Sequence, residues 1–121
     1  MGVINFKLTK VYKLAFEQAM EVFFITKSFP KEETYSLTDQ VRRFSRSVCT
    51  NLAEAYRKKI YLANFISKLT DCDGENSETG VWLDFSLACN YMIEEQHKHF
   101  ISRNDEIGRL LGHMRKYPEK Y

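Results

Sequence analysis

The sequence predicts an all-α fold, an antiparallel up-down-up-down four-helix bundle. Apolar residues recur at helical spacing in four blocks, each about 22 residues long, or roughly 33 Å as a helix. Only two prolines and five glycines occur in 121 residues, which favours long regular elements. The breaks between blocks are about 3–8 residues, and connections this short join antiparallel neighbours. We expect residues 1–121 to form a single domain with helices at about 6–28, 36–58, 62–88 and 93–116.

The first helix is expected over residues 6–28, because its apolar residues follow helical spacing. Pro30 disfavours helix at Phe29 and so marks the end. The expected core stripe comprises Leu8, Val11, Tyr12, Ala15, Phe16, Ala19, Met20, Val22 and Phe23.

The second helix is expected over residues 36–58. Ser36 is followed three residues later by Asp39, which resembles a loose capping box. Apolar residues then recur every three or four positions, which is typical of an amphipathic helix. The expected core stripe is Leu37, Val41, Phe44, Val48, Leu52 and Ala55.

The third helix is expected to run without a break over residues 62–88, although Gly74 and Gly80 weaken the pattern. The segment "DCDGEN" resembles the start of an EF-hand. Counted from Asp71, however, the glycine at loop position 6 and the glutamate at position 12 are missing, so we exclude calcium. The residues that carry the helical period are Phe65, Leu69, Cys72, Thr79, Trp82, Leu83, Phe85 and Ser86.

The fourth helix is expected over residues 93–116, and Pro118 ends it. Glu94 and His97 form a Glu-x-x-His pair, but a di-iron bundle needs two such pairs. We therefore expect no metal site and interpret His97 as a core or interface residue. The heptad positions are Ile93, His97, Phe100, Asn104, Ile107, Leu111 and Met114.

Composition excludes several protein classes. No run of about 18 apolar residues occurs, so no membrane-spanning helix is expected. The start "MGVINFKLTK" lacks the apolar region of a signal peptide. Cys49, Cys72 and Cys89 are widely spaced and form no CxxC pair, which predicts reduced thiols and neither a zinc site nor a disulfide framework. We expect a cytoplasmic protein with no cofactor and identify no small-molecule substrate.

Charge is distributed unevenly along the chain. The net charge is only +2, but the charges are separated along the chain. The segment from Thr34 to Lys59 is strongly basic, and the segment from Leu69 to Glu95 contains Asp and Glu but no Lys or Arg. The basic segment predicts a nucleic-acid-binding face, and Tyr56 offers a ring for base stacking. A solvated surface, or a contact with the acidic segment of a neighbouring copy, explains the same pattern. The candidate binding residues are Arg42, Arg43, Arg46, Arg57, Lys58 and Lys59.

A polar stripe borders the core stripe of the second helix. Gln40, Arg43, Ser47, Asn51 and Glu54 lie within about 80° of one another on a helical wheel. Such a stripe can hold a small ligand or a metal. It can also form a hydrogen-bonded seam at a helix–helix or subunit contact. We favour the seam, comprising Gln40, Ser47, Asn51 and Glu54, because no set of nucleophile, base and orienting residue accompanies it.

The second helix and the segment before it carry a family resemblance. The order "FP-x-E-x-x-x-L-x-x-Q-x-R-R-x-x-x-S-(I/V)-x-x-N-(I/L)-A-E-(G/A)" is similar to that of four-helix bundle proteins encoded in 23S rRNA intervening sequences. Further along, Phe65, Ile66, Leu69 and Glu78 fit the third helix of that family. The residues that match the order are Phe29, Pro30, Glu32 or Glu33, Leu37, Gln40, Arg42, Arg43, Ser47, Val48, Asn51, Leu52, Ala53, Glu54 and Ala55.

This resemblance implies a bundle that assembles into ring-like homopentamers, and it implies no established reaction. The family's reading frames lie inside rRNA insertions, and related bundles are accessory subunits of a reverse transcriptase in diversity-generating retroelements. Asp71, Asp73 and Glu75 depart from the family pattern, which has small and apolar residues there. We expect a non-enzymatic oligomeric protein that is an accessory module for RNA or a ribonucleoprotein. The alternatives are a purely structural oligomer without nucleic-acid binding and a metal-dependent bundle enzyme.

Overall fold

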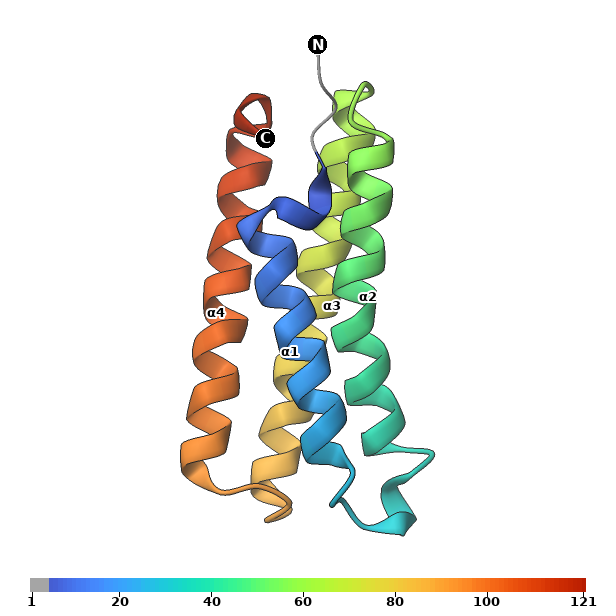
Figure 1. The fold of residues 1–121 in the computed structure, drawn as a ribbon, viewed down its shortest axis with the longest axis vertical. Helices are drawn as coiled ribbons and strands as arrows, with labels where there is room; N and C mark the ends of the chain where they lie inside the picture. Colours follow the sequence, from blue (N-terminus) through green and yellow to red (C-terminus); the bar gives the residue numbers. More distant parts are fainter. Residues whose placement is uncertain (1–4) are drawn as a thin grey trace.

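Four helices account for most of the chain in the computed structural model, which describes residues 5–121 (Figure 1). Within that range no strand forms. The helices are α1 (Lys10–Thr26), α2 (Leu37–Arg57), α3 (Leu62–Ala88) and α4 (Glu94–Lys116). Short 3-10 turns occupy Phe6–Leu8, Lys31–Glu33 and Pro118–Lys120.

Each helix packs against its neighbours in the sequence, and α1 also packs against α4 (Figure 1). The pairs α1–α3 and α2–α4 therefore lie diagonally across the bundle. This arrangement confirms the predicted all-α four-helix bundle. The short turn between α3 and α4 contains Asn90, whose φ of 63° is left-handed. Asparagine tolerates this conformation better than most residues, which suits it to so tight a turn.

One helix start and one predicted helix cap differ from the sequence prediction. α1 begins at Lys10, about four residues late, because the Thr9 hydroxyl accepts a hydrogen bond from the Tyr12 amide at 3.3 Å and caps the helix. The predicted capping box at Ser36 is wrong. The Ser36 hydroxyl donates to Glu33 Oε1 at 2.5 Å and does not cap α2.

α3 runs through Gly74 and Gly80 without interruption, as predicted. Gly74 lies on the outside of the helix, where it has room for a side chain and does not interrupt the backbone hydrogen bonds. Gly80 is buried against α4, and a Cβ there would lie 2.8 Å from Asn104 Nδ2. Gly80 therefore permits a close approach of α3 and α4.

Two apolar clusters fill the bundle, one toward each end. The cluster that includes the C-terminal half of α2 comprises Val11, Ala15, Val48, Cys49, Leu52, Ala55, Phe65, Leu69, Cys72, Ile107, Leu111 and Met114. The cluster that includes the N-terminal half of α2 comprises Val22, Phe29, Leu37, Val41, Leu83, Met92 and Phe100.

Buried polar side chains lie between the two clusters. Gln18 Nε2 donates to the Phe100 carbonyl at 2.9 Å and links α1 to α4. Asn76 Nδ2 donates to the Asn104 carbonyl, also at 2.9 Å, and links α3 to α4. Because a buried amide must find a partner, these bonds favour one register of α4 against its neighbours.

The predicted core stripe of α1 is partly wrong. Val11, Ala15, Ala19 and Val22 are buried as expected, but Phe16 is 50% exposed. The other predicted core residues that are exposed are Met20, also in α1, Leu8 in the turn before α1, Phe85 in α3 and Ile93 just before α4. α1 is apolar around most of its circumference, so its periodicity does not define one buried face.

Candidate nucleic-acid interface

The buried stripe of α2 determines which side chains face outward. Leu37, Val41, Val48, Leu52 and Ala55 all point into the core, as predicted. Since α-helical positions repeat every 3.6 residues, the positions opposite them must face solvent. The exposed basic residues of this face are Arg43, Arg46, Arg57 and Lys58, whereas Arg42 and Lys59 are half-buried.

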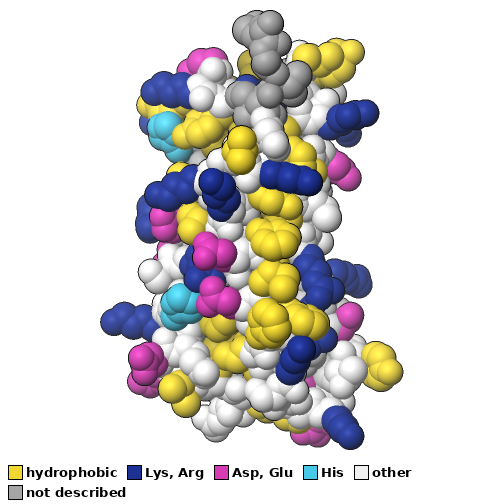
Figure 2. Space-filling view, viewed as in Figure 1, with side chains coloured by type: hydrophobic (Ala, Val, Ile, Leu, Met, Phe, Trp, Pro, Cys, Tyr) yellow, Lys and Arg dark blue, Asp and Glu magenta, His cyan; other side chains and the backbone are white. Residues whose placement is uncertain are grey.

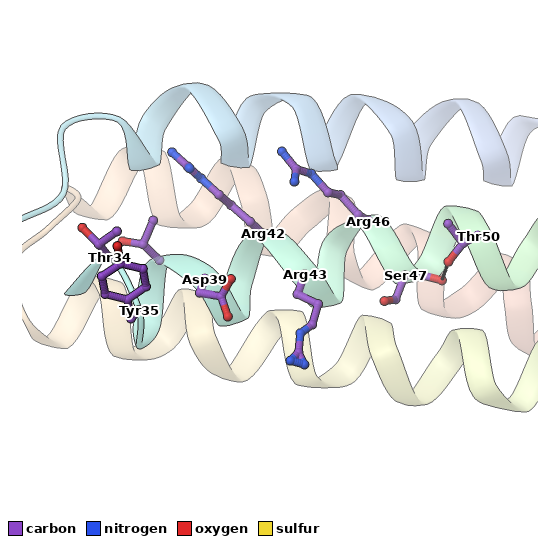
Figure 3. Close-up of a pocket in the computed structure, with 9 residues that line it drawn as sticks. Thr34, Tyr35, Asp39, Arg42, Arg43, Arg46, Ser47 and Thr50 are labelled. Carbon is purple, nitrogen blue, oxygen red and sulfur yellow. Dashed lines mark hydrogen bonds between the residues drawn. The ribbon is translucent and has the colours of Figure 1, made fainter. Parts of the chain in front are cut away.

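The first basic cluster, Arg42, Arg43 and Arg46, lies in the N-terminal half of α2. Arg42 Nε donates to Thr26 Oγ1 at 2.7 Å, and its guanidinium carbon lies 4.9 Å from the centre of the Phe23 ring. Arg46 lies 5.6 Å from the same ring. Figure 3 shows Arg42 and Arg46 extending toward α1, whereas Arg43 extends toward α3. The three cations therefore line both edges of the exposed face.

The second basic cluster, Arg57, Lys58 and Lys59, lies where α2 ends. Lys59 Nζ is 5.7 Å from the centre of the Phe65 ring, so this ammonium makes a cation–π contact. Arg46 and Arg57 are eleven positions apart, or roughly 17 Å along a helix. The two clusters thus lie well separated on one rod-like element.

None of these six basic side chains forms an ion pair with a residue in the described part of the chain. Some basic residues elsewhere are paired: Arg103 lies 2.7 Å from Glu21, and Arg115 lies 2.9 Å from Asp73. The outer face of α2 therefore carries positive charge without a paired carboxylate, which attracts anions.

The adjacent face of α3 has the opposite charge. Asp71 and Glu78 are exposed there. Burial, together with the nearby charges of Glu78 and Asp71, raises the pKa of the Glu75 carboxyl. This face repels a polyanion, so it forms a boundary to the basic face of α2.

The predicted polar seam lies along the edge of α2 that borders α3. Gln40, Ser47 and Asn51 are half-buried and Glu54 is exposed. Across residues 5–121, the structure contains no side-chain hydrogen bond that joins these four to one another. Glu54 instead forms a 2.6 Å ion pair with Lys68 of α3, and the hydrogen bond from Lys68 lowers the pKa of the Glu54 carboxyl. A contact of this seam with another copy stays a prediction.

An open hollow of about 490 Å³ lies beside the first basic cluster (Figure 3). We call it the α2 hollow. Its lining residues carry hydroxyl groups, one carboxylate and guanidinium groups. The lining residues are Thr34, Tyr35, Thr38, Asp39, Arg42, Arg43, Arg46, Ser47 and Thr50.

Other reactive side chains take structural positions. Burial raises the pKa of the Cys49 thiol to about 11 and that of Cys72 to about 12, so both are protonated near neutral pH. His97 contacts Asp84 at 2.8 Å. No group of three or more histidine, cysteine or acidic residues is placed to hold a metal among the described residues.

Two features were not found from the sequence. Tyr35 lines the α2 hollow, but it lies in an aperiodic loop, where no pattern points to it. The α3–α4 contact pairs Asn76 with Gly108 and Asn104 with Gly80. Here a signal exists: the pattern N-x-x-x-G occurs in both helices, at 76–80 and at 104–108.

Within residues 5–121, no helix combines the length and the apolar character needed to span a membrane. This agrees with the absence of a long apolar run in the sequence.

Comparisons with known proteins place the chain in a family. Residues 7–113 match the family described as 23S rRNA-intervening sequence protein. The chain is also similar to the crystal structure of a protein of unknown function from the S23 ribosomal protein family of Bacteroides thetaiotaomicron. The two are 27% identical with a TM-score of 0.80, over 88% of this chain and 95% of the other. No curated protein matches. The chain belongs to the 23S rRNA-intervening sequence protein family.

Proposed function

We propose that this protein is a non-enzymatic accessory module that binds RNA within a cytoplasmic ribonucleoprotein. The observation that carries the proposal is the basic face of α2, whose six cationic side chains have no ion-pair partner among residues 5–121. Unpaired cations release condensed counterions when they contact phosphates, and this release drives binding. Membership of a family named for its rRNA context supports the same proposal.

RNA affinity as a function of salt tests this proposal. The wild-type protein should bind a fluorescent RNA at about 50 mM salt and lose affinity steeply as salt rises. The double variant Arg43→Ala/Arg46→Ala removes two cations from the face. It should bind more weakly, with the salt slope reduced by about 1.4 if each arginine contacts one phosphate of a single strand.

A matched control removes the same charge elsewhere. Lys98 and Arg109 are exposed on α4, diagonally across from α2, and form no ion pair within residues 5–121. Lys98→Ala/Arg109→Ala should keep both the affinity and the salt slope. Absence of RNA binding at about 50 mM salt, or equal loss in the two double variants, would contradict the proposal.

We also propose that the protein self-associates, as a homopentamer according to the family resemblance. An exposed apolar stripe on α1 supports a contact with a second copy (Figure 2). Phe16 is 50% exposed and Phe24 is 58% exposed, with Met20 between them. Contiguous apolar surface of this kind is typical of protein interfaces.

Native mass spectrometry of Phe16→Glu/Phe24→Glu tests the self-association. Two carboxylates in an apolar contact should dissociate the oligomer, because neither has a partner there. Val81→Glu, at an exposed site on α3, is the control and should leave the mass unchanged. A monomeric wild-type protein, or a double variant with the wild-type mass, argues against this interface.

Salt dependence of the native mass distinguishes a second type of contact. If the basic face of α2 meets the acidic face of α3 in a neighbour, high salt should loosen the oligomer. If the apolar stripe on α1 forms the contact, the oligomer should resist salt.

A further inference from the structure

Tyr35 projects from the loop that precedes α2, at one end of the α2 hollow (Figure 3). Its side chain is 94% exposed, the largest fraction among the exposed large apolar residues of the described chain. The ring covers no part of the core, so both of its faces are open to solvent. An exposed aromatic ring beside uncompensated cations is the arrangement that proteins use to stack single-stranded bases.

The loop that carries Tyr35 is held in one conformation. Glu33 Oε1 accepts the Ser36 hydroxyl at 2.5 Å and the Leu37 amide at 3.4 Å. Glu33 Oε2 accepts the Tyr91 hydroxyl at 2.8 Å, which ties the loop to the turn between α3 and α4. These hydrogen bonds order the backbone of the loop, so the loop has less backbone entropy to lose when Tyr35 binds a partner.

The polar groups of the α2 hollow follow an order along α2. In Figure 3, Asp39 lies between Tyr35 and Arg43, and Arg46 lies farther along the helix. Neither Asp39 nor Arg43 has an ion-pair partner in the described chain. The Thr38 hydroxyl, on a residue that lines the hollow, is buried and has no hydrogen-bond partner there. Along α2, the hollow thus offers first an aromatic ring, then a carboxylate that can accept a hydrogen bond, and then cations.

Building on the proposed function, we infer that the α2 hollow binds an unpaired nucleotide of single-stranded RNA. Tyr35 stacks on the base, and the Asp39 carboxylate accepts a hydrogen bond from an exocyclic amino group on the edge of that base. Arg43 and Arg46 contact the neighbouring phosphates. A base in a duplex is stacked on its neighbours and cannot offer its face to Tyr35. Because uracil has no amino group, the site prefers adenine and cytosine to uracil.

Fluorescence anisotropy with labelled oligoribonucleotides tests this inference. The probes are oligo(A), oligo(C), oligo(U) and an RNA duplex of equal length, at low salt. Wild-type protein should bind oligo(A) and oligo(C) more tightly than oligo(U) and the duplex. Tyr35→Ala should weaken single-strand binding by about 5- to 150-fold, which corresponds to a stacking contribution of about 1–3 kcal/mol per base. Tyr35→Phe keeps the ring and should bind like wild type.

Asp39→Ala should remove the preference for oligo(A) and oligo(C) over oligo(U). Because Tyr35 and Asp39 are exposed, neither substitution should affect folding, and circular dichroism checks this. If RNA binds through the basic face but Tyr35→Ala binds like wild type, the stacking site is contradicted and the proposed function stands. If no RNA binds at all, the proposed function itself is contradicted.

Discussion

Gly74 and Gly80 belong to the same helix but have different surroundings. A Cβ on Gly74 would have no heavy atom within 4 Å, whereas on Gly80 it would lie 2.8 Å from Asn104 Nδ2. Asn104 is only 9% exposed and lies at the α3–α4 contact. Room for its amide to move away is therefore limited.

Alanine at these two positions should have opposite effects on stability. Gly74→Ala should raise the free energy of unfolding by about 0.5–1 kcal/mol, because alanine loses less backbone entropy in a helix. Gly80→Ala should lower it by about 1–2 kcal/mol, because the added methyl group overpacks the contact. Urea unfolding followed by circular dichroism measures both. If both variants raise, or both lower, the free energy of unfolding, the proposed difference between the two glycines is contradicted.

Residue-level prediction succeeded where one side of a helix is clearly polar. In α2, Val41, Val48 and Leu52 lie on one side of the helix, the charged residues lie on the other, and all three are buried. The exposure of Tyr35 could not be predicted from the local sequence pattern. Its exposure depends on how Glu33 fixes the loop, and one of the Glu33 partners, Tyr91, is 58 residues away in the sequence. No local pattern contains that information.

At the scale of elements, the connection between α1 and α2 depends on one carboxylate. Hydrogen bonds from the Ser36 hydroxyl and the Tyr91 hydroxyl lower the pKa of Glu33. The ionised form is thus favoured by folding. It stabilises the fold fully above the ordinary pKa of 4.5, and this contribution is lost as pH falls through the lower pKa of the folded state.

Glu33→Gln should therefore make the protein less sensitive to acid. Wild-type protein should lose free energy of unfolding as pH falls below about 4.5, and the variant should lose less over the same range. Urea unfolding at several pH values measures the two slopes. Glu32→Gln is the control, because Glu32 is exposed and makes no side-chain hydrogen bond within residues 5–121, so it should keep the wild-type slope. Equal slopes for wild type and Glu33→Gln contradict the role of Glu33.

Helices differ in how well their sequences define a buried face. α1 carries Phe16, Met20 and Phe24 outside and Val11 and Val22 inside, so apolar residues occupy both sides. The helical spacing of apolar residues in α1 is clear, but which face of α1 is buried depends on how α2 and α4 pack against it. The excess apolar surface is itself informative, since it supports the self-association that we propose for α1.

At the scale of the whole molecule, sequence patterns predicted the bundle because helix length, short connections and apolar period all agree. They did not predict that Gln18 and Asn76 are buried between the two core clusters. Gln18 and Asn76 look like surface residues in a hydropathy pattern, yet each bonds a backbone carbonyl of α4. Such pairs depend on the relative register of separate helices, which single-helix periodicity does not contain.

The basic face of α2 was predicted from charge alone, and the structure adds which of its cations are exposed. Arg42 is held by Thr26, and Lys59 lies over aromatic rings. Arg43, Arg46, Arg57 and Lys58 are exposed and form no ion pair in the part of the chain that the structure describes. We therefore propose that RNA contacts α2 and not the other three helices.

Ultraviolet crosslinking of bound single-stranded RNA, mapped by mass spectrometry, tests this assignment most directly. At low salt, the crosslinked peptides should come from the segment between Thr34 and Lys59, with Tyr35 among the modified residues. The matched variant Arg43→Ala/Arg46→Ala should reduce the yield, and Lys98→Ala/Arg109→Ala should not. Crosslinks confined to α4, or an absence of crosslinks at low salt, would contradict RNA binding by the basic face of α2.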